Sequence, residues 1–195
     1  AMEGSIFIAG AGVQWLRDKM KFFKKAPETE KIVKSLKDNN NIYLVPAFTG
    51  LGAPYWDANA RGVLSGITRD TSPKEIVRAT IEAVAYQTYD LFEAMKHDGL
   101  RPKIVKVDGG MVMNNWFSQF LSDIVNVKVL RPKVQETTAL GAAFMAGLQI
   151  GVYKSLKDIS KNWHLDKKFS PKMKNPLRSK LLRGWSAAIK KTLSN

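Results

Sequence analysis

Short apolar runs alternate along this chain with longer segments in which apolar residues recur every three or four positions. This alternation predicts a mixed α/β domain, because strands have a period of two and helices a period of 3.6 residues. We expect strands over residues 5–9, 42–45, 62–67, 103–107 and 127–130. We expect helices over residues 13–20, 28–38, 73–97, 114–125 and 139–150, and a last one from residue 175 onward.

The clearest helix start lies at Thr71–Glu75. Ser72 is placed at the N-cap, Pro73 at the first helical position and Glu75 three residues after the cap, which is the pattern of a capping box. Thr137 and Thr138 precede a helix rich in glycine and alanine, and we expect them to cap it.

A long loop, residues 46–61, separates two predicted strands. Loops of this length inside compact domains are functional or disordered, and the aromatic residues in this one argue against disorder. We expect Tyr55 and Trp56 to pack within the loop rather than to contact a substrate. Asp57 and Arg61 are expected to form a pair that organises it.

The composition excludes several kinds of chemistry. The chain has 195 residues and no cysteine, so it has no disulfide, thiolate zinc site or cysteine nucleophile, and a reducing cytoplasm is the expected location. With two histidines, it gives little support to a histidine metal site or a serine–histidine triad. No apolar run approaches the roughly 18 residues of a membrane helix, and no basic leader precedes Ile6, so we expect neither membrane nor secretory targeting.

The positive charge is concentrated near the end of the chain. Residues 151–195 hold twelve lysines and arginines against two acidic residues, which accounts for +10 of the net +14. This stretch has no aromatic RNA-binding pattern, helix-turn-helix spacing or zinc ligands, so we interpret it mainly as a solvated surface and regard nucleic-acid binding as unlikely. A basic module that binds a partner through residues 151–195 is the alternative, and salt-dependent DNA binding would favour it.

Two glycine turns join a predicted strand to a predicted helix, one at 10–12 and one at 108–110. Glycine lets a backbone approach a ligand closely, and the first turn of a helix offers free N–H groups that suit phosphate. Each turn alone could be an ordinary tight connection, but two in one small domain favour nucleotide binding. Neither matches the P-loop or the dinucleotide fingerprint. Gln14 and Asn114 lie just beyond the turns, where their amides could read a ribose or a base edge.

These motifs resemble the FGGY family of carbohydrate kinases. The resemblance runs nearly the full length of the chain, and the loop VPAFTGLGAPYWD is similar to that of the glycerol kinase branch. It implies a ribonuclease-H-like domain of the actin/hexokinase ATPase type, with ATP bound in the cleft between two such domains. The positions that match the nucleotide contacts are Gly10, Gln14, Gly110 and Asn114; Mg²⁺ would be held mainly through the nucleotide. Asp108 could order the second turn or water near the metal.

The resemblance also implies that important parts of the site lie outside this sequence. In the family, the domain that binds glycerol and carries the general base precedes this one, as do the first two strands of this domain. We therefore expect no catalytic residue and no kinase activity in this chain alone, because phosphoryl transfer depends on positioning between two sides of a cleft. A non-catalytic remnant that still binds nucleotide is the alternative. The partner would be the missing amino-terminal kinase domain.

Two structural expectations follow. We expect residues 1–152 to form the nucleotide-binding domain, with residues 153–195 as a basic segment whose terminal helix packs on it. We also expect the strand that begins at Ser5 to have an unpaired edge, through which the chain self-associates or pairs with the missing part.

Overall fold

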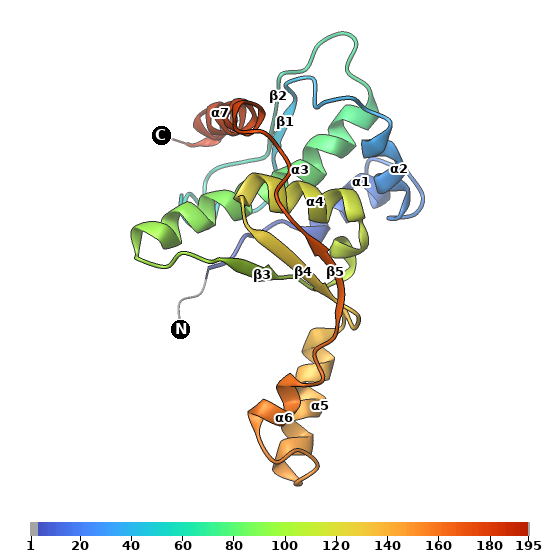
Figure 1. The fold of residues 1–195 in the computed structure, drawn as a ribbon. Coiled ribbons are helices and arrows are strands. Elements are labelled where there is room, and N and C mark those ends of the chain that lie inside the picture. The colour runs from blue at the N-terminus through green and yellow to red at the C-terminus, as the bar shows by residue number, and fades with distance from the viewer. Residues whose placement is uncertain (1–3, 195) are drawn as a thin grey trace.

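The computed structural model describes residues 4–194 of the chain (Figure 1). The first three residues, which were part of the argument against a basic leader, lie outside the described range. The elements follow one another as α1 (Gly10–Asp18), α2 (Glu28–Lys34), β1 (Tyr43–Val45), β2 (Val63–Ser65), α3 (Pro73–His97), β3 (Ile104–Lys106), the 3₁₀ helix η1 (Gly110–Met113), α4 (Asn115–Val125), β4 (Lys128–Pro132), α5 (Thr137–Gln149), α6 (Leu156–Ser160), β5 (Leu165–Phe169) and α7 (Asn175–Thr192).

Helix α3 is the centre of the domain and packs against α1, α2, α4 and β1. Its start confirms the predicted capping box: Ser72 accepts a hydrogen bond from the Lys74 N–H, and Glu75 accepts one from the Ser72 N–H. The half of α3 that follows is buried on nearly every side, so it lies between layers rather than on the surface. This position brings the elements of the candidate site together around one rigid helix.

Two small sheets flank α3. Strands β1 and β2 pair antiparallel, with Leu44 opposite Leu64. In the second sheet the order is β3-β4-β5; β3 and β4 are parallel, and β4 and β5 antiparallel. Strand β5 was not predicted, because four of its five residues are exposed and only Phe169 is buried, so it lacks an apolar pattern.

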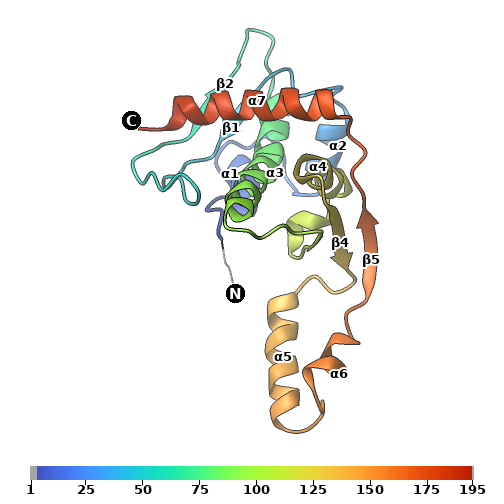
Figure 2. The ribbon, with the colours of Figure 1, turned by 60° about the vertical axis from the view of Figure 1, so that its left-hand side comes forward.

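The end of the chain returns to the core. Helix α7 crosses β1 and β2 (Figure 2), and its Leu181, Trp185 and Ile189 are buried as the helical spacing predicts. The Trp185 ring stacks on Tyr86 of α3 with centroids 5.3 Å apart. Leu177 is the exception, since it is exposed at the start of the helix. Seven of the twelve basic residues of 151–195 therefore belong to β5 and α7, which each bury one side, and the other five lie in or near α6 and in the loop before α7.

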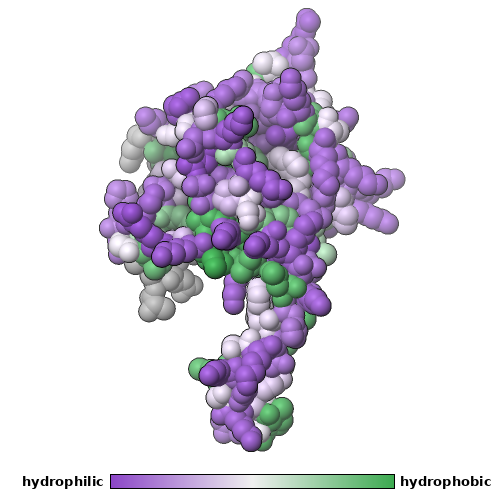
Figure 3. Space-filling model, in the orientation of Figure 1, coloured by the Kyte–Doolittle hydropathy of each residue, from purple (hydrophilic) through white to green (hydrophobic). Residues whose placement is uncertain are grey.

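Helices α5 and α6 form an arm that stands away from the body (Figures 1 and 2). They make at most marginal contact with any other helix or strand of the described residues, and Gly147 is the one residue of α5 that is buried. The arm leaves Met145 and Ile150 exposed, and Figure 3 shows apolar surface where the body meets it. An uncharged helix with an open apolar face is a surface that lacks a partner.

Two local predictions are wrong. Residues 5–9 form no strand: the chain bends at Phe7 and Ala9, and these residues pair with no strand of the described range. They are held instead by α3, where Gln87 donates a hydrogen bond to the Ile8 carbonyl. Among residues 4–194 the unpaired edges of the three-stranded sheet are therefore those of β3 and β5, not a strand starting at Ser5. Likewise Thr137 and Thr138 do not cap α5: they lie inside it, and its N-cap is Glu136 without a side-chain bond.

Between residues 4 and 194, none of the helices combines the length and the apolar character needed to cross a bilayer.

Candidate functional site

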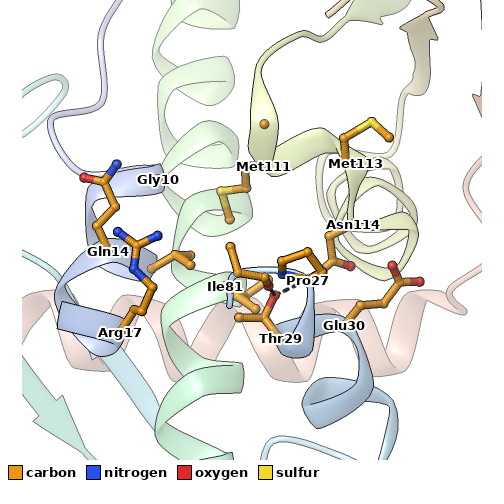
Figure 4. Close-up of a pocket in the computed structure, with 13 residues that line it drawn as sticks. Gly10, Gln14, Arg17, Pro27, Thr29, Glu30, Ile81, Met111, Met113 and Asn114 are labelled. Carbon is orange, nitrogen blue, oxygen red and sulfur yellow. Dashed lines mark hydrogen bonds between the residues drawn. The ribbon is translucent and has the colours of Figure 1, made fainter. Parts of the chain in front are cut away.

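A cavity of about 340 Å³ opens between α1, the start of α2, α3 and the η1–α4 segment (Figure 4). All four predicted site residues line it, although they come from segments about 100 positions apart in the sequence. The full lining is Gly10, Val13, Gln14, Arg17, Ala26, Pro27, Thr29, Glu30, Ile81, Gly110, Met111, Met113 and Asn114.

One wall is a single stripe of α1. Gly10, Val13, Gln14 and Arg17 are spaced as neighbours on one helix face and all border the cavity. The opposite side of α1 is fixed by close packing, since a Cβ on the buried Gly12 would lie 2.9 Å from a methyl group of Thr80. Close packing on α3 thus holds the stripe toward the cavity.

The facing wall is the turn from β3 through η1 into α4. Gly109 has φ +83°, a left-handed conformation that glycine adopts without strain, and it begins the 3₁₀ turn at Gly110. Asn114 is the N-cap of α4: its side-chain oxygen accepts from the Phe117 N–H at 2.9 Å. Its side-chain nitrogen lies 3.4 Å from the Thr29 hydroxyl. The side-chain oxygen of Asn114 is therefore used to cap the helix. Its side-chain N–H groups are the ones that can meet a ligand.

Arg131 of β4 supports this wall from behind. Its buried guanidinium donates to the carbonyl oxygens of Val112 at 2.8 Å and Met113 at 3.3 Å, and it pairs with Asp166 at 2.7 Å. The carbonyl groups of the short 3₁₀ turn thus have a charged partner within the protein. Arg131 thus joins the sheet to the cavity wall, and Lys167 of β5 adds a second link through the Asn115 side-chain oxygen at 3.1 Å.

The floor is the start of α2, which the sequence did not single out. Pro27, Thr29 and Glu30 all reach the cavity. The Glu30 carboxylate accepts from the Asn115 N–H at 3.3 Å and from Lys34 at 2.5 Å. Burial pushes the pKa of Glu30 upward, but the hydrogen bonds from Lys34 and Asn115 outweigh it and hold this pKa below its ordinary value. Glu30 is therefore an anion that joins α2 to α4.

A planar charged group completes the α1 stripe. The Arg17 guanidinium holds both oxygens of the neighbouring Asp18 carboxylate, with Nε–Oδ1 at 2.7 Å and Nη2–Oδ2 at 2.8 Å. Figure 4 shows Gln14 and Arg17 on one side of the cavity, and Asn114 and Glu30 on the other. The cavity thus has hydrogen-bonding groups on both sides and apolar side chains of α1, α3 and η1 between them.

Asp108 is exposed and its side chain makes no hydrogen bond within residues 4–194, so the expected ordering of the turn by this carboxylate is not seen. The Gly109 N–H instead bonds the Gln135 carbonyl. Within the described range, no cluster of three carboxylate or histidine side chains is arranged to hold a metal ion.

The long loop at 46–61 lies apart from this cavity and is held by two carboxylates. Asp90 of α3 accepts from the Tyr55 hydroxyl at 2.8 Å and from the Trp185 indole at 2.6 Å. Burial raises the pKa of Asp90 to about 6, against the lowering effect of these two hydrogen bonds. Asp57 binds the loop's own amides and Ser194 rather than Arg61, so the predicted Asp57–Arg61 pair is wrong.

The two aromatic residues of this loop differ. Tyr55 packs as predicted, but Trp56 is 74% exposed and has φ +52°, so the expectation that it packs within the loop is wrong. The Arg61 guanidinium bonds the carbonyl groups of Ala58 and Ala60. The loop is therefore organised by separate contacts of its charged side chains, and its exposed tryptophan contributes nothing to the cavity.

Residues 1–150 match the model of the FGGY family of carbohydrate kinases, C-terminal domain. The chain belongs to this family. Its place in the FGGY family is the carboxy-terminal, ribonuclease-H-like domain, which confirms the predicted fold class. The similarity that the loop sequence suggested is also found: glycerol kinase 1 of Pseudomonas aeruginosa is 55% identical over 194 residues.

Solved structures agree with this assignment. The glycerol kinase of Plasmodium falciparum, determined with ADP, matches 98% of the chain at 37% identity and a TM-score of 0.87. A xylulose kinase from Lactobacillus acidophilus matches 96% at 25% identity and a TM-score of 0.78. The chain spans 39% of the length of the Pseudomonas relative and 38% of the Plasmodium one. It corresponds to the FGGY carboxy-terminal domain of glycerol kinases.

Proposed function

We propose that this chain is the nucleotide-binding side of an ATP-dependent glycerol kinase, which converts ATP and glycerol to ADP and glycerol 3-phosphate. The observation that carries the proposal is the convergence of Gly10, Gln14, Gly110 and Asn114 on one cavity. These four residues were predicted from two separate glycine turns. Nothing in the sequence alone required the two turns to face one another. The ADP named for the Plasmodium glycerol kinase supports the same ligand class.

The cavity fits a nucleotide in a specific way. A Cβ added at Gly10 or Gly110 would meet no protein atom within 4 Å, so glycine at these positions keeps the cavity open rather than relieving a clash. The first turn of α1 has no side-chain cap. The Gly12 N–H bonds the Ala9 carbonyl, but the N–H groups of Gly10 and Ala11 have no partner within residues 4–194 and can meet an anion. Gln14 and the N–H groups of Asn114 can bond sugar hydroxyls or a base edge.

The remaining chemistry belongs to a second domain. Mg²⁺ would supply charge stabilisation to the phosphates and be held mainly through them. We infer that the general base belongs to that second domain and that glycerol binds only in the complete enzyme. We infer that the chain alone binds nucleotide weakly and transfers no phosphate.

The partner that completes the site is an amino-terminal glycerol kinase domain. The unpaired edge of β3 and the open apolar face of α5 are the surfaces available to strands that precede this region in a longer chain. On this view residues 1–152 are the nucleotide-binding domain and residues 153–195 extend it with β5 and α7. We keep the cytoplasm as the expected location because the chain has no cysteine.

Calorimetric titration with Mg-ATP tests the proposal. Gly10→Val and Gly110→Val would fill the cavity, and each should weaken binding by roughly tenfold or more, which is about 1.4 kcal/mol. Gly141→Val on α5 is the matched control, because a side chain there also meets open space but lies far from the cavity. If millimolar Mg-ATP gives no heat with the unmodified chain, or if all three variants bind alike, the proposal is wrong. A coupled assay should detect no glycerol phosphorylation.

A further inference from the structure

The cavity has a direction that follows from α1. Gly10 is the first residue of this helix and Arg17 is seven positions later, about 10 Å away at 1.5 Å per residue. The helix N-terminus carries a partial positive charge and free N–H groups, which favour phosphate at the Gly10 end. A nucleotide lying along the stripe would then place its base at the Arg17 end.

The surroundings of Arg17 suit a flat aromatic ring. Val13 lies one turn earlier on the same stripe, and Pro27 lies on the floor. The facing wall presents the thioethers of Met111 and Met113, and sulfur makes favourable contacts with aromatic rings. These side chains offer apolar contact area without fixed hydrogen-bonding partners.

The ion pair with Asp18 determines what Arg17 can offer. Asp18 takes Nε and Nη2 in a two-pronged contact, so it fixes the orientation of the guanidinium plane and offsets its charge. The two flat faces of the guanidinium remain available, and such a face stacks well on an aromatic ring. A free arginine would suit a phosphate, whereas one already paired with a carboxylate is better suited to stacking.

We propose that Arg17, oriented by Asp18, stacks on the base of the bound nucleotide and is a base-binding residue of this site. This inference rests on the proposed nucleotide site and adds its orientation: phosphates at the Gly10 end, base between Arg17 and the methionine wall. Stacking does not depend on the identity of the base, so Arg17 sets affinity for nucleosides in general.

The test compares adenosine, AMP, ADP and ATP, each titrated with Mg²⁺ present and followed by NMR of the ¹⁵N-labelled chain. Arg17→Ala should weaken all four by the same factor, about two- to fivefold, the size of an exposed cation–π contact. Arg17→Lys should lose as much as Arg17→Ala, because it keeps the charge but not the planar face. Lys19→Ala is the control: it removes the same charge from an exposed residue that does not line the cavity.

Three results would overturn the inference. A loss that is absent for adenosine and grows from AMP to ATP would make Arg17 a phosphate ligand. Full retention of affinity by Arg17→Lys would show that charge alone matters. Unchanged binding of all four ligands by both variants would remove Arg17 from the site while leaving the nucleotide proposal intact. If the unmodified chain binds none of the four, the proposed function fails together with this inference.

Discussion

Replacing Asp90 by asparagine should make the domain more stable at neutral pH. Asp90 is a partly buried carboxylate between the long loop and α7, and burial raises its pKa from 3.8 to about 6. A folded-state pKa above the unfolded value means that the folded protein holds the proton more tightly. The stability that the protonated Asp90 carboxyl group contributes is then fully present below pH 4 and is lost as the pH rises through about 6.

The size of the effect follows from the shift. About two pKa units correspond to roughly 3 kcal/mol of unfolding free energy lost between pH 4 and pH 7. Asparagine keeps a carbonyl oxygen that can accept from Tyr55 and Trp185 but has no charge to bury. Asp90→Asn should therefore remove this pH dependence and stabilise the fold at pH 8 by about 1 to 3 kcal/mol.

Urea unfolding at a series of pH values between 4 and 8, followed by tryptophan fluorescence, measures this difference. The difference in unfolding free energy between the unmodified chain and Asp90→Asn reports on this one carboxyl group, because all other titrating groups are common to both proteins. Asp70→Asn, an exposed residue of the turn before α3, is the control and should leave the pH profile in place. Parallel curves for the unmodified chain and Asp90→Asn over this range would refute the argument that burial of the Asp90 charge is costly.

Two further changes test the fold. Ser72→Ala removes the N-cap of α3 and should lower the unfolding free energy by about 1 kcal/mol, whereas Ser72→Asp, which can still accept from the first turn, should lower it less; equal losses would show that the cap is not what matters. Ile104→Lys places a charge on the unpaired edge of β3 and should reduce self-association seen by light scattering at high concentration. A clean monomer before the substitution would show that this edge does not recruit a second copy.

Structural features that depend on residues within one helix or strand could be predicted from the sequence. The capping box at Ser72 and the apolar spacing of α3 are complete within 25 residues, and the structure confirms both. The candidate residues Gly10 and Gly110 could also be picked out, because a glycine turn before a helix has a local signature; that they bind a nucleotide stays a prediction. That they share one cavity depends on α3, which packs against both α1 and α4.

The parts that could not be predicted depend on contacts between distant segments. Residues 5–9 have the composition of a strand, but a strand exists only with a neighbour beside it. Strand β5 is polar and takes its place by pairing with β4. Glu30 lies in a polar helix whose pattern marks no residue as special, and it gains its role only because Asn115 lies against it. Arg131, buried under the η1 turn, is likewise defined by partners some 20 residues away.

The return of α7 to the core has a consequence during synthesis of the protein. Trp185 is 1% exposed and belongs to the same core as Tyr86 of α3 and Phe120 of α4. It lies in α7, which is translated after all the other helices and strands described here. Until Trp185 leaves the ribosome, β1 and β2 lack the helix that packs on them, and Tyr86 of α3 lacks its stacking partner. The nascent chain therefore leaves the part of the core that α7 covers open until synthesis of this region is almost finished, and such exposed apolar surface attracts chaperones and promotes aggregation. Shortening the chain at its end should accordingly reduce the yield of folded protein far more than the small number of residues removed suggests.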